Sequence, residues 1–541
     1  MSGSVHSRWR LFLGSRELKR NRVEQALANF QGAAEADPGN PEGFIGMGQC
    51  HQRAQRYEEA IAAHQRALRL QPSSGEAHAH LALAYASIGR QAEAVDELRS
   101  ALRIQPNLRD VGVWEERLGT WLAQLGQWQE ATEAFGRSLK ARRNVGVYCN
   151  LGAALYQLER YAEAHEAYRQ ASLLAPDDSM AYLGAGLAYC GLKRYPEAVV
   201  ALEHALELNP NDAGAHYNLG LTYAQLQRHS EAINELRRAI ELHPLDAEAH
   251  YALGVSFAQA RLFDRAVEAY HQAIALRPDY ADAYCSLGGA WGEMGNASQA
   301  IAAYMKAVEH DPGDVNAWRG LSACYEHAGQ FAEALEACRH VARLSPNDAG
   351  AIHSLGRLYF FLGQDAEALE CAREALRLNP ASPWFHLLAA IAIERLDGHA
   401  QATLEFEKAL QCAHDAEIAG QDTAELRLLC GLALAGLEDH QNAIAEFKKA
   451  LKLKPDYFEA FQGLGRAFLE LERIQEALPA LLRASELRPR MPEVHDRLGV
   501  AYLKAENREA AQRQLQVLQS LAPSYRGELH RLLETESAQR Q

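Results

Sequence analysis

Seven prolines, each 34 residues after the one before, constrain this chain more than any other feature. They are Pro176, Pro210, Pro244, Pro278, Pro312, Pro346 and Pro380. The residues between them repeat the same sequence pattern with small changes. A fixed period of this length indicates one supersecondary unit stacked many times. Such an array has no central core, so a chain of 541 residues need not be divided into globular domains.

The sequence pattern within each 34-residue period predicts two helices. We number the repeat so that its proline is position 32. Positions 7 and 8 then read Leu-Gly or a near variant, position 20 is alanine, and positions 11 and 24 are large or aromatic. Positions 4, 7, 8 and 11 share one helical face, and positions 20, 24 and 27 share another. The small residues at positions 8 and 20 predict a close crossing of the two helices.

Turn residues predict where the helices end. Glycine at position 15, as in Gly89 and Gly295, predicts a left-handed residue after the first helix. The proline at position 32 predicts the end of the second helix. Asp or Asn at position 33 predicts a cap for the next first helix. These residues are Asp177, Asn211, Asp279, Asn347 and Asp456.

This pattern resembles the tetratricopeptide repeat (TPR) family, and the resemblance covers about fifteen tandem repeats between residues 7 and 525. It implies an all-α, right-handed superhelical solenoid of antiparallel helix pairs with a C-terminal capping helix. The spacing predicts repeats 1–3 in residues 1–108, repeats 4–12 in 109–416, an inserted loop at 417–423, repeats 13–15 in 424–525, and a capping helix with a polar tail in 526–541. Arg143 and His414 occupy proline slots, where we expect the path to bend.

Several function classes are disfavoured. The net charge of −15 argues against nucleic acid, although residues 1–22 carry six basic residues against Glu17 alone, which usually indicates a solvated helix face. Nine cysteines without a CxxC pair suggest reduced thiols, and no signal peptide or membrane span is recognisable. We therefore expect a cytoplasmic protein that is not an enzyme, with no catalytic residue, metal or cofactor. Histidines at position 4 (His78, His216, His250, His386 and His495) are interpreted as core packing.

Family resemblance assigns partner binding to the concave groove formed by the first helices. The predicted groove residues are Asn150, Tyr217, Asn218, Leu221, Tyr251, Val255, Cys285, Arg319, His353, Arg357, Gln462 and Arg466. The apolar and aromatic residues precede the Arg and His residues along the chain. This order favours a protein or peptide partner with apolar anchors and an acidic segment. The sequence leaves open whether the Leu and Val side chains bind a partner or pack between repeats.

We therefore expect a non-catalytic interaction scaffold or adaptor. Two alternatives stay open: a substrate-recruiting subunit of a separate enzyme, for example in a glycosyltransferase-type complex, and a self-assembling structural protein. Homo-oligomerisation is likewise left open. The carboxylate clamp of the TPR co-chaperones and the unbroken asparagine ladder of O-GlcNAc transferase are not recognisable at the corresponding repeat positions.

Overall fold

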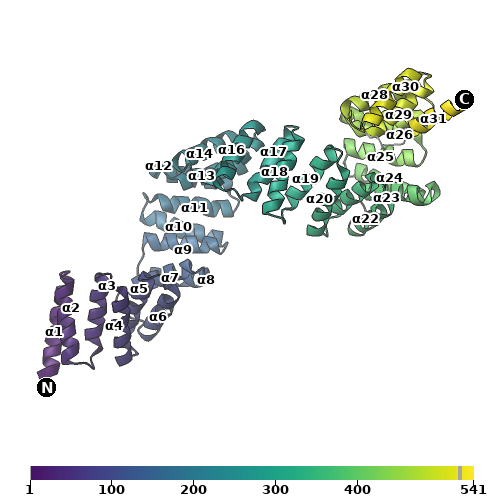
Figure 1. The fold of residues 1–541 in the computed structure, drawn as a ribbon. Coiled ribbons are helices and arrows are strands. Elements are labelled where there is room, and N and C mark those ends of the chain that lie inside the picture. The colour runs from purple at the N-terminus through teal and green to yellow at the C-terminus, as the bar shows by residue number, and fades with distance from the viewer. Residues whose placement is uncertain (1, 522–526, 541) are drawn as a thin grey trace. The chain divides into compact units, whose positions relative to one another are not determined.

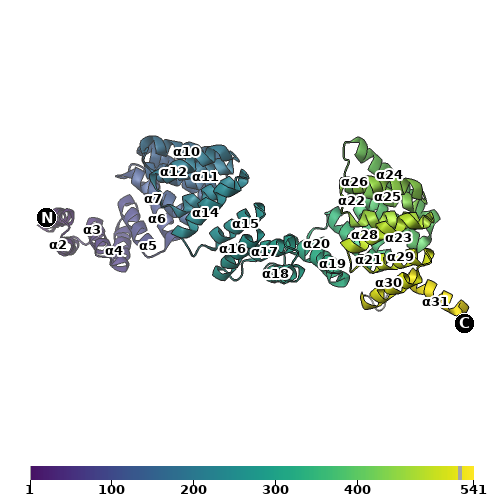
Figure 2. The same ribbon diagram turned by 90° about the horizontal axis from the view of Figure 1, so that it is seen from above.

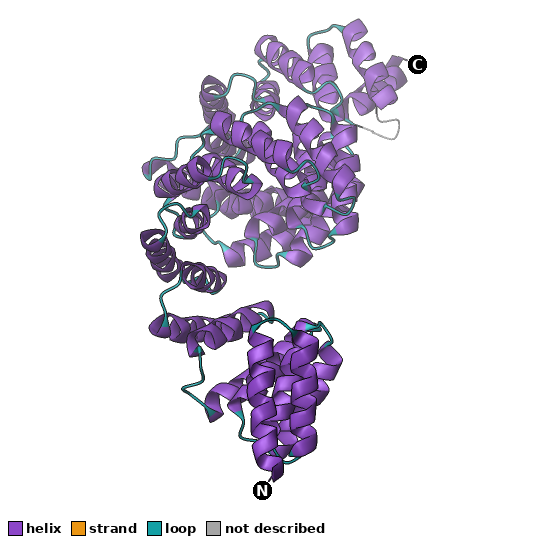
Figure 3. Ribbon diagram, turned by 90° about the vertical axis from the view of Figure 1, so that its left-hand side faces the viewer, coloured by secondary structure: helices purple, strands orange, loops and turns teal. Residues whose placement is uncertain are grey.

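The computed structural model describes residues 2–521 and 527–540, and within them every regular element is a helix. Figure 3 shows helices and connecting loops throughout. The chain forms two compact units, residues 1–262 and 263–541. Within each unit, consecutive helices pack side by side (Figures 1 and 2). The predicted all-α TPR solenoid is confirmed. The predicted division into three groups of repeats and a loop stays a prediction.

The first unit holds α1 to α15. Odd-numbered helices are the first helices of their repeats, and even-numbered ones the second. Their bounds are α1 Ser2–Lys19, α2 Val23–Ala36, α3 Pro41–Arg53, α4 Tyr57–Leu70, α5 Gly75–Ser87, α6 Gln91–Ile104, α7 Val111–Gln124, α8 Trp128–Ala141, α9 Val145–Gln157, α10 Tyr161–Leu174, α11 Ser179–Gly191, α12 Tyr195–Leu208, α13 Ala213–Gln225, α14 His229–Leu242 and α15 Ala247–Gln259.

The second unit holds α16 to α31. Their bounds are α16 Phe263–Leu276, α17 Ala281–Glu293, α18 Ala297–His310, α19 Val315–His327, α20 Phe331–Leu344, α21 Ala349–Phe361, α22 Asp365–Leu378, α23 Pro383–Asp397, α24 His399–Ile418, α25 Ala424–Gly436, α26 His440–Leu453, α27 Phe458–Glu470, α28 Ile474–Leu487, α29 Pro492–Lys504, α30 Arg508–Leu521 and α31 Glu528–Arg540. The predicted end of the last repeat, residue 525, lies outside the described residues.

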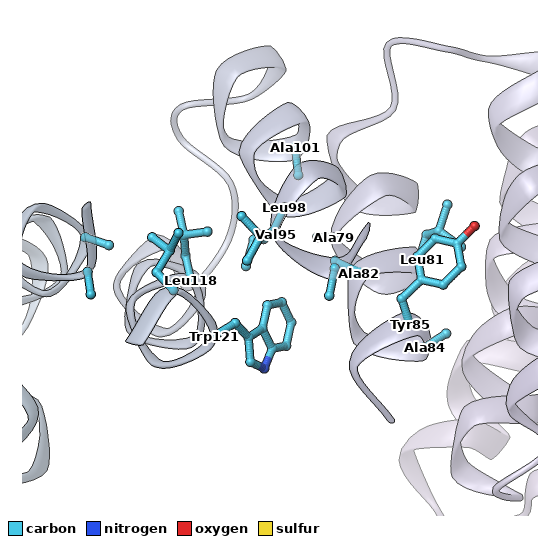
Figure 4. Packing of buried hydrophobic residues seen from close by; sticks show 14 of the residues in the cluster. Ala79, Leu81, Ala82, Ala84, Tyr85, Val95, Leu98, Ala101, Leu118 and Trp121 are labelled. Atoms are coloured by element: carbon cyan, nitrogen blue, oxygen red, sulfur yellow. The ribbon is translucent and has the colours of Figure 1, made fainter. Parts of the chain in front are cut away.

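The close crossing of the two helices is real. A Cβ atom added to Gly220 at position 8 would lie 2.7 Å from Cγ of Leu236 at position 24. One added to Gly119 would lie 2.7 Å from the ring of Phe135. Leu236 and Phe135 are both buried. Figure 4 shows the apolar packing between successive helices of the first unit, where Val95 and Leu98 of α6 lie between Ala79 and Ala82 of α5 and Leu118 of α7.

The residue at position 15 has a left-handed backbone conformation, as predicted. Gly89 has a φ of +79°, and the other glycines at this position have similar values. Repeats without glycine force an ordinary side chain into the same conformation, as at Gln227 (φ +58°) and Glu472 (φ +57°). The turn between the two helices therefore sets this backbone, and glycine is only the residue that adopts it most easily.

The predicted position of the helix cap was wrong by one residue. Asp178, not Asp177, caps α11, because its carboxylate accepts from the Met180 amide at 3.0 Å. Asp212 caps α13 in the same way, with the Ala215 amide at 3.0 Å. A cap must directly precede the first helical residue to reach the free amides of the first turn. Position 33 lies one residue too early, within the turn.

The two slots without proline behave differently. The second helix of the fourth repeat, α8, still ends at Ala141, two residues before Arg143. In contrast, α24 runs past His414 to Ile418 and has 20 residues instead of the usual 14. The first residues of the predicted loop at 417–423 are therefore helical. Proline is one way to end the second helix, and its absence lengthens the helix only in the twelfth repeat.

The position-4 histidines pack as interpreted, and they also form hydrogen bonds that the sequence did not reveal. His216 Nε2 donates to the carbonyl oxygen of Pro210 at 3.1 Å, and its Nδ1 lies 2.7 Å from Glu235 Oε2. His386 repeats this arrangement with Pro380 (3.0 Å) and Glu405 (2.7 Å). In the repeats with histidine at position 4, the bond to the proline carbonyl ties the turn before the first helix to the helix itself.

The capping helix α31 packs on α29 and α30. The carboxylate of Asp496 accepts from the Glu528 and Leu529 amides at 3.1 and 3.0 Å, which caps the start of α31. Leu529 is fully buried beneath it. The end of the solenoid is thereby covered by one helix whose inner side is apolar.

Candidate functional site: the inner surface of the first helices

The side chain at position 5 of a first helix lies beside the N-cap aspartate of the next first helix. Arg319 Nη2 is 3.1 Å from Asp348 Oδ2. Burial, together with a hydrogen bond to Asp314, raises the pKa of the Cys285 thiol to about 12. We use the name inner surface for the first-helix positions 2, 5, 9, 12 and 13. Position 5 therefore occupies the seam between successive repeats.

The apolar part of the predicted groove lies in the first unit. Tyr217 and Leu221 lie on α13, Tyr251 and Val255 lie on the adjacent first helix α15, and all four are half-buried. Burial raises the pKa of the Tyr217 hydroxyl, and the carboxylates of Glu248 and Asp246 add to the effect. These four side chains therefore contribute to the packing between repeats and still present surface to solvent.

The two predicted asparagines differ in how freely they can bind. Asn150 on α9 is exposed. The side-chain amide of Asn218 donates to the carbonyl of Gly214 in its own helix at 2.7 Å. That bond uses one of the two side-chain N–H groups of Asn218. The side-chain carbonyl oxygen is the atom with which Asn218 could accept a hydrogen bond from a partner.

The predicted cationic part lies in the second unit, and its charges are largely compensated. Arg319 is paired with Asp348, and Arg357 Nη1 lies 2.7 Å from Glu326 Oε1 of the preceding repeat. His353 packs against the Phe385 ring, with centroids 5.1 Å apart. Burial, with a smaller effect from Arg357, lowers the pKa of His353 to about 4, so the imidazole is neutral at pH 7. Two of the predicted cations are therefore paired within the chain, and the prediction that this part binds an acidic segment stays a prediction.

The remaining predicted residues lie farther along the second unit, on α27. Gln462 is half-buried and Arg466 is exposed. The twelve predicted residues are thus split equally between the two units. The structure brings Tyr217, Leu221, Tyr251 and Val255 together on adjacent helices. His353 and Arg357 are neighbours on α21, and Arg357 reaches Glu326 of α19.

Metal-binding clusters and reactive thiols were sought among the described residues. No cluster of three or more His, Cys, Asp or Glu side chains there has the geometry to hold a metal ion. Burial raises the pKa of the Cys149 thiol to about 11, which lowers the thiolate fraction that a nucleophile needs. No described helix is long and apolar enough to cross a membrane.

One polar feature was missed by sequence reasoning. The extension of α24 brings Glu417 to the buried Arg427 of α25, with Nη2 and Oε1 2.6 Å apart. Asp422 (2.7 Å) and Glu446 (3.3 Å) complete a three-carboxylate shell, and hydrogen bonds to Asp422 and Glu417 raise the pKa of Arg427. A cavity of about 470 Å³ opens beside it, between α24, α25 and α26. The sequence signal was the missing proline at His414.

The stacked helix pairs define a helical-repeat protein. Profiles of the tetratricopeptide repeat family match well over half of the chain, and the chain belongs to that family. The matched residues are 17–63, 45–108, 145–178, 217–281, 257–324, 293–355, 325–391, 399–458 and 434–496, and a profile described as TPR repeat matches 186–227.

Solved structures of repeat proteins are also similar. MamA is 30% identical, with 30% of this chain and 96% of MamA covered and a TM-score of 0.29. YrrB, described as a TPR protein with an unusual peptide-binding site, is 26% identical, with 35% and 97% covered and a TM-score of 0.31. The Cut9–Hcn1 hetero-tetramer of the APC/C is 16% identical, with 85% and 96% covered and a TM-score of 0.40. No curated protein gives a significant match.

Proposed function

We propose that this chain is a non-catalytic scaffold that binds a polypeptide partner on the inner surface of α13 and α15. The observation that supports this is the set of four half-buried apolar side chains Tyr217, Leu221, Tyr251 and Val255, which come from the same two positions of adjacent repeats. Two aromatic and two aliphatic side chains in this arrangement suit the apolar anchors of an extended peptide or a helix.

The charges beside these anchors refine the partner. Asp246 and Glu248 lie close enough to Tyr217 to affect its pKa. Arg319 and Arg357, the cations expected to hold an acidic segment, already have carboxylate partners in the second unit. The proposal therefore keeps the apolar anchors, omits the acidic segment, and favours a partner that is neutral or basic near its anchors.

A random peptide library selected on the immobilised full-length chain supplies a defined probe. We expect enriched peptides to carry two spaced apolar residues. The Y217A/Y251A double variant should bind a selected peptide on the order of tenfold more weakly or worse, with unchanged helicity by circular dichroism. Tyr195→Ala is the matched control, because Tyr195 is half-buried in the same unit but begins the second helix α12.

Two results would contradict the proposal. If the double variant loses its helicity, Tyr217 and Tyr251 belong to the packing between repeats. If Tyr195→Ala weakens peptide binding as much as the double variant does, the peptide does not bind on α13 and α15.

A further inference from the structure

The outer face of α1 differs from the corresponding face of the interior first helices. Position 3 is buried in most interior first helices, whether it is small, as at Ala181 and Ala215, or large, as at Phe385. Position 6 contacts the preceding second helix where it is glycine, since a Cβ added to Gly184 would lie 2.2 Å from the Tyr168 ring of α10. In the first repeat these two positions hold Trp9 and Phe12.

Trp9 and Phe12 form an exposed apolar patch. Each has a relative exposure of 58%, and their rings stack with centroids 5.8 Å apart. Val5, 70% exposed, lies four residues before Trp9 and so shares its helical face. In an interior repeat, large side chains at these two positions are covered, as at Phe385 and Leu388 of α23, whereas Trp9 and Phe12 remain exposed.

Cations surround the patch and no exposed carboxylate opposes them in α1. Arg8, Arg16 and Lys19 are exposed on the helix, and at 100° per residue all three lie within about 60° of the Val5–Trp9–Phe12 stripe. The one carboxylate of α1, Glu17, is buried, and it is paired with Arg16 at 3.2 Å and with Arg20 at 3.6 Å. The charge of α1 is thus opposite to the net charge of −15 of the whole chain.

We infer that α1 is a docking surface for an anionic lipid bilayer, on which it lies in the plane of the interface. Exposed Trp and Phe beside Arg and Lys form the side-chain set of helices that lie at a membrane surface. The 18 residues of α1 span about 27 Å. A bilayer also offers a continuous negative surface that needs no matching shape. The acidic remainder of the chain is repelled by the same lipids, so this end would make the contact.

A second copy of α1 is a poorer occupant. The exposed face presents cations and no exposed carboxylate, so two such faces would repel each other in either orientation. An acidic helix of another protein would satisfy the same charges. The experiment below separates that occupant from the bilayer.

Flotation of the full-length chain with lipid vesicles tests the inference. We expect flotation with equal parts of phosphatidylcholine and phosphatidylserine, weaker flotation as salt is added, and none with phosphatidylcholine alone. The W9S/F12S double variant should lose at least about tenfold in partitioning. The R8E/K19E double variant should lose on the order of 30-fold or more, at roughly fivefold for each cation removed. Arg8 and Lys19 lie outside the Glu17 ion pairs, so this variant should leave the fold intact.

Leu245→Ser is the matched control, because Leu245 is 81% exposed in a turn of the same unit. It should float as the wild type does. Failure of the wild-type chain to float with anionic vesicles would overturn the inference and favour a protein occupant. Equal flotation with neutral vesicles, or an unchanged R8E/K19E variant, would overturn it as well. Peptide binding on α13 and α15 should be unaffected by all of these variants, which separates this test from that of the proposed function.

Discussion

Two buried polar clusters, one in each unit, show opposite ways of placing polar groups inside a repeat stack. In the first unit, His64 of α4 is fully buried and stacks on His80 of α5, with centroids 5.8 Å apart. Neither ring nitrogen of His64 has a hydrogen-bond partner within the described part of the chain. In the second unit, Arg427 is surrounded by Glu417, Asp422 and Glu446.

The difference lies in which charge state each cluster requires. Burial lowers the pKa of His64 to about 3 and that of His80 to about 4, with smaller effects from neighbouring histidines on His64 and from Arg117 on His80, so both rings are neutral in the folded chain at pH 7. The cluster around Arg427 is stable only while its carboxylates are ionised, and hydrogen bonds to Arg427 lower the pKa values of Glu417 and Asp422. One cluster excludes charge and the other depends on it.

A buried apolar residue, Leu219, serves as the reference for the size and the pH dependence of these effects on the free energy of unfolding. Leu219 of α13 is buried beside Val199 and Leu202. Leu219→Ala should reduce the free energy of unfolding by about 2 to 5 kcal/mol through lost burial and a cavity. The loss should be the same at pH 7 and pH 5, because no titrating group is changed. Hydrogen exchange read by mass spectrometry should locate the effect in the repeats around α13. A pH-dependent loss would contradict this assignment.

Removing the central cation should have the next largest effect. Arg427→Met takes the cation away from Glu417 and Asp422, while Glu446 keeps its ion pair with Lys449. The variant should cost about 2 to 3 kcal/mol, less than for a sealed ion pair because Glu417 and Asp422 reach solvent. Faster hydrogen exchange should appear in α24 to α26 and not in α4 or α5. Lys448→Met, a cation on α26 outside this cluster, is the control. Equal effects from both variants would show that the cluster contributes no specific stabilisation.

Mild acid should distinguish the clusters without mutation. The folded-state pKa values of His64 and His80 lie below the ordinary value of 6.5, so the unfolded state takes up protons first. Their contribution is therefore complete above pH 6.5 and is lost as the pH falls. Between pH 6.5 and 5 the loss is about 2 kcal/mol for each histidine. Glu417 and Asp422 have lowered pKa values in the folded state. Their contribution to the free energy of unfolding therefore starts to fall only below their ordinary pKa values of 4.5 and 3.8.

Hydrogen exchange at pH 5, corrected for the intrinsic rate, should therefore show α4 and α5 opening before α25 and α26. Simultaneous opening of the two regions, or earlier opening of α25, would contradict the comparison.

The smallest expected effect comes from removing the unpaired imidazole. Position 24 holds an aromatic ring in several repeats, as at Phe30 and Phe135. His64→Phe should raise the free energy of unfolding at pH 7 by about 1 kcal/mol, since a buried polar group without a partner is removed. It should also halve the acid sensitivity of α4 and α5. Thermal unfolding at pH 7 and pH 5 measures both. Destabilisation at pH 7 would show that the ring nitrogens of His64 are solvated after all.

Much of the fold could be predicted because it follows from local periodicity. The Leu-Gly pair at positions 7 and 8 and the alanine at position 20 report which faces touch, so the helix pairs and the left-handed Gly89 follow from spacing alone. The cap was misplaced because Asp177 and Asp178 are adjacent, and only backbone geometry decides which carboxylate reaches the free amides. The extension of α24 could not be derived, because Arg143 and His414 give the same sequence signal.

The candidate site was less predictable, because periodicity identifies a face but not the groups opposite it. Arg319 and Arg357 are on the predicted face, yet each is paired with a carboxylate from another part of the chain. Asp348 caps the next first helix and pairs with Arg319, and Glu326 of the preceding first helix pairs with Arg357. The aromatic patch on α1 was overlooked for a related reason. Residues 1–22 were interpreted by charge alone, and the exposure of Trp9 becomes apparent only when no helix is found over it.

The bond from the position-4 histidine to the proline carbonyl has a consequence for how such a chain can evolve. The donor and acceptor are six residues apart, as in His216 and Pro210, so the joint between two repeats is encoded by one short stretch of sequence. A duplicated or deleted segment of 34 residues contains one such joint and leaves the same proline-to-histidine spacing at its boundaries. Gene-level copying can therefore lengthen or shorten the array without any compensating change elsewhere in the protein.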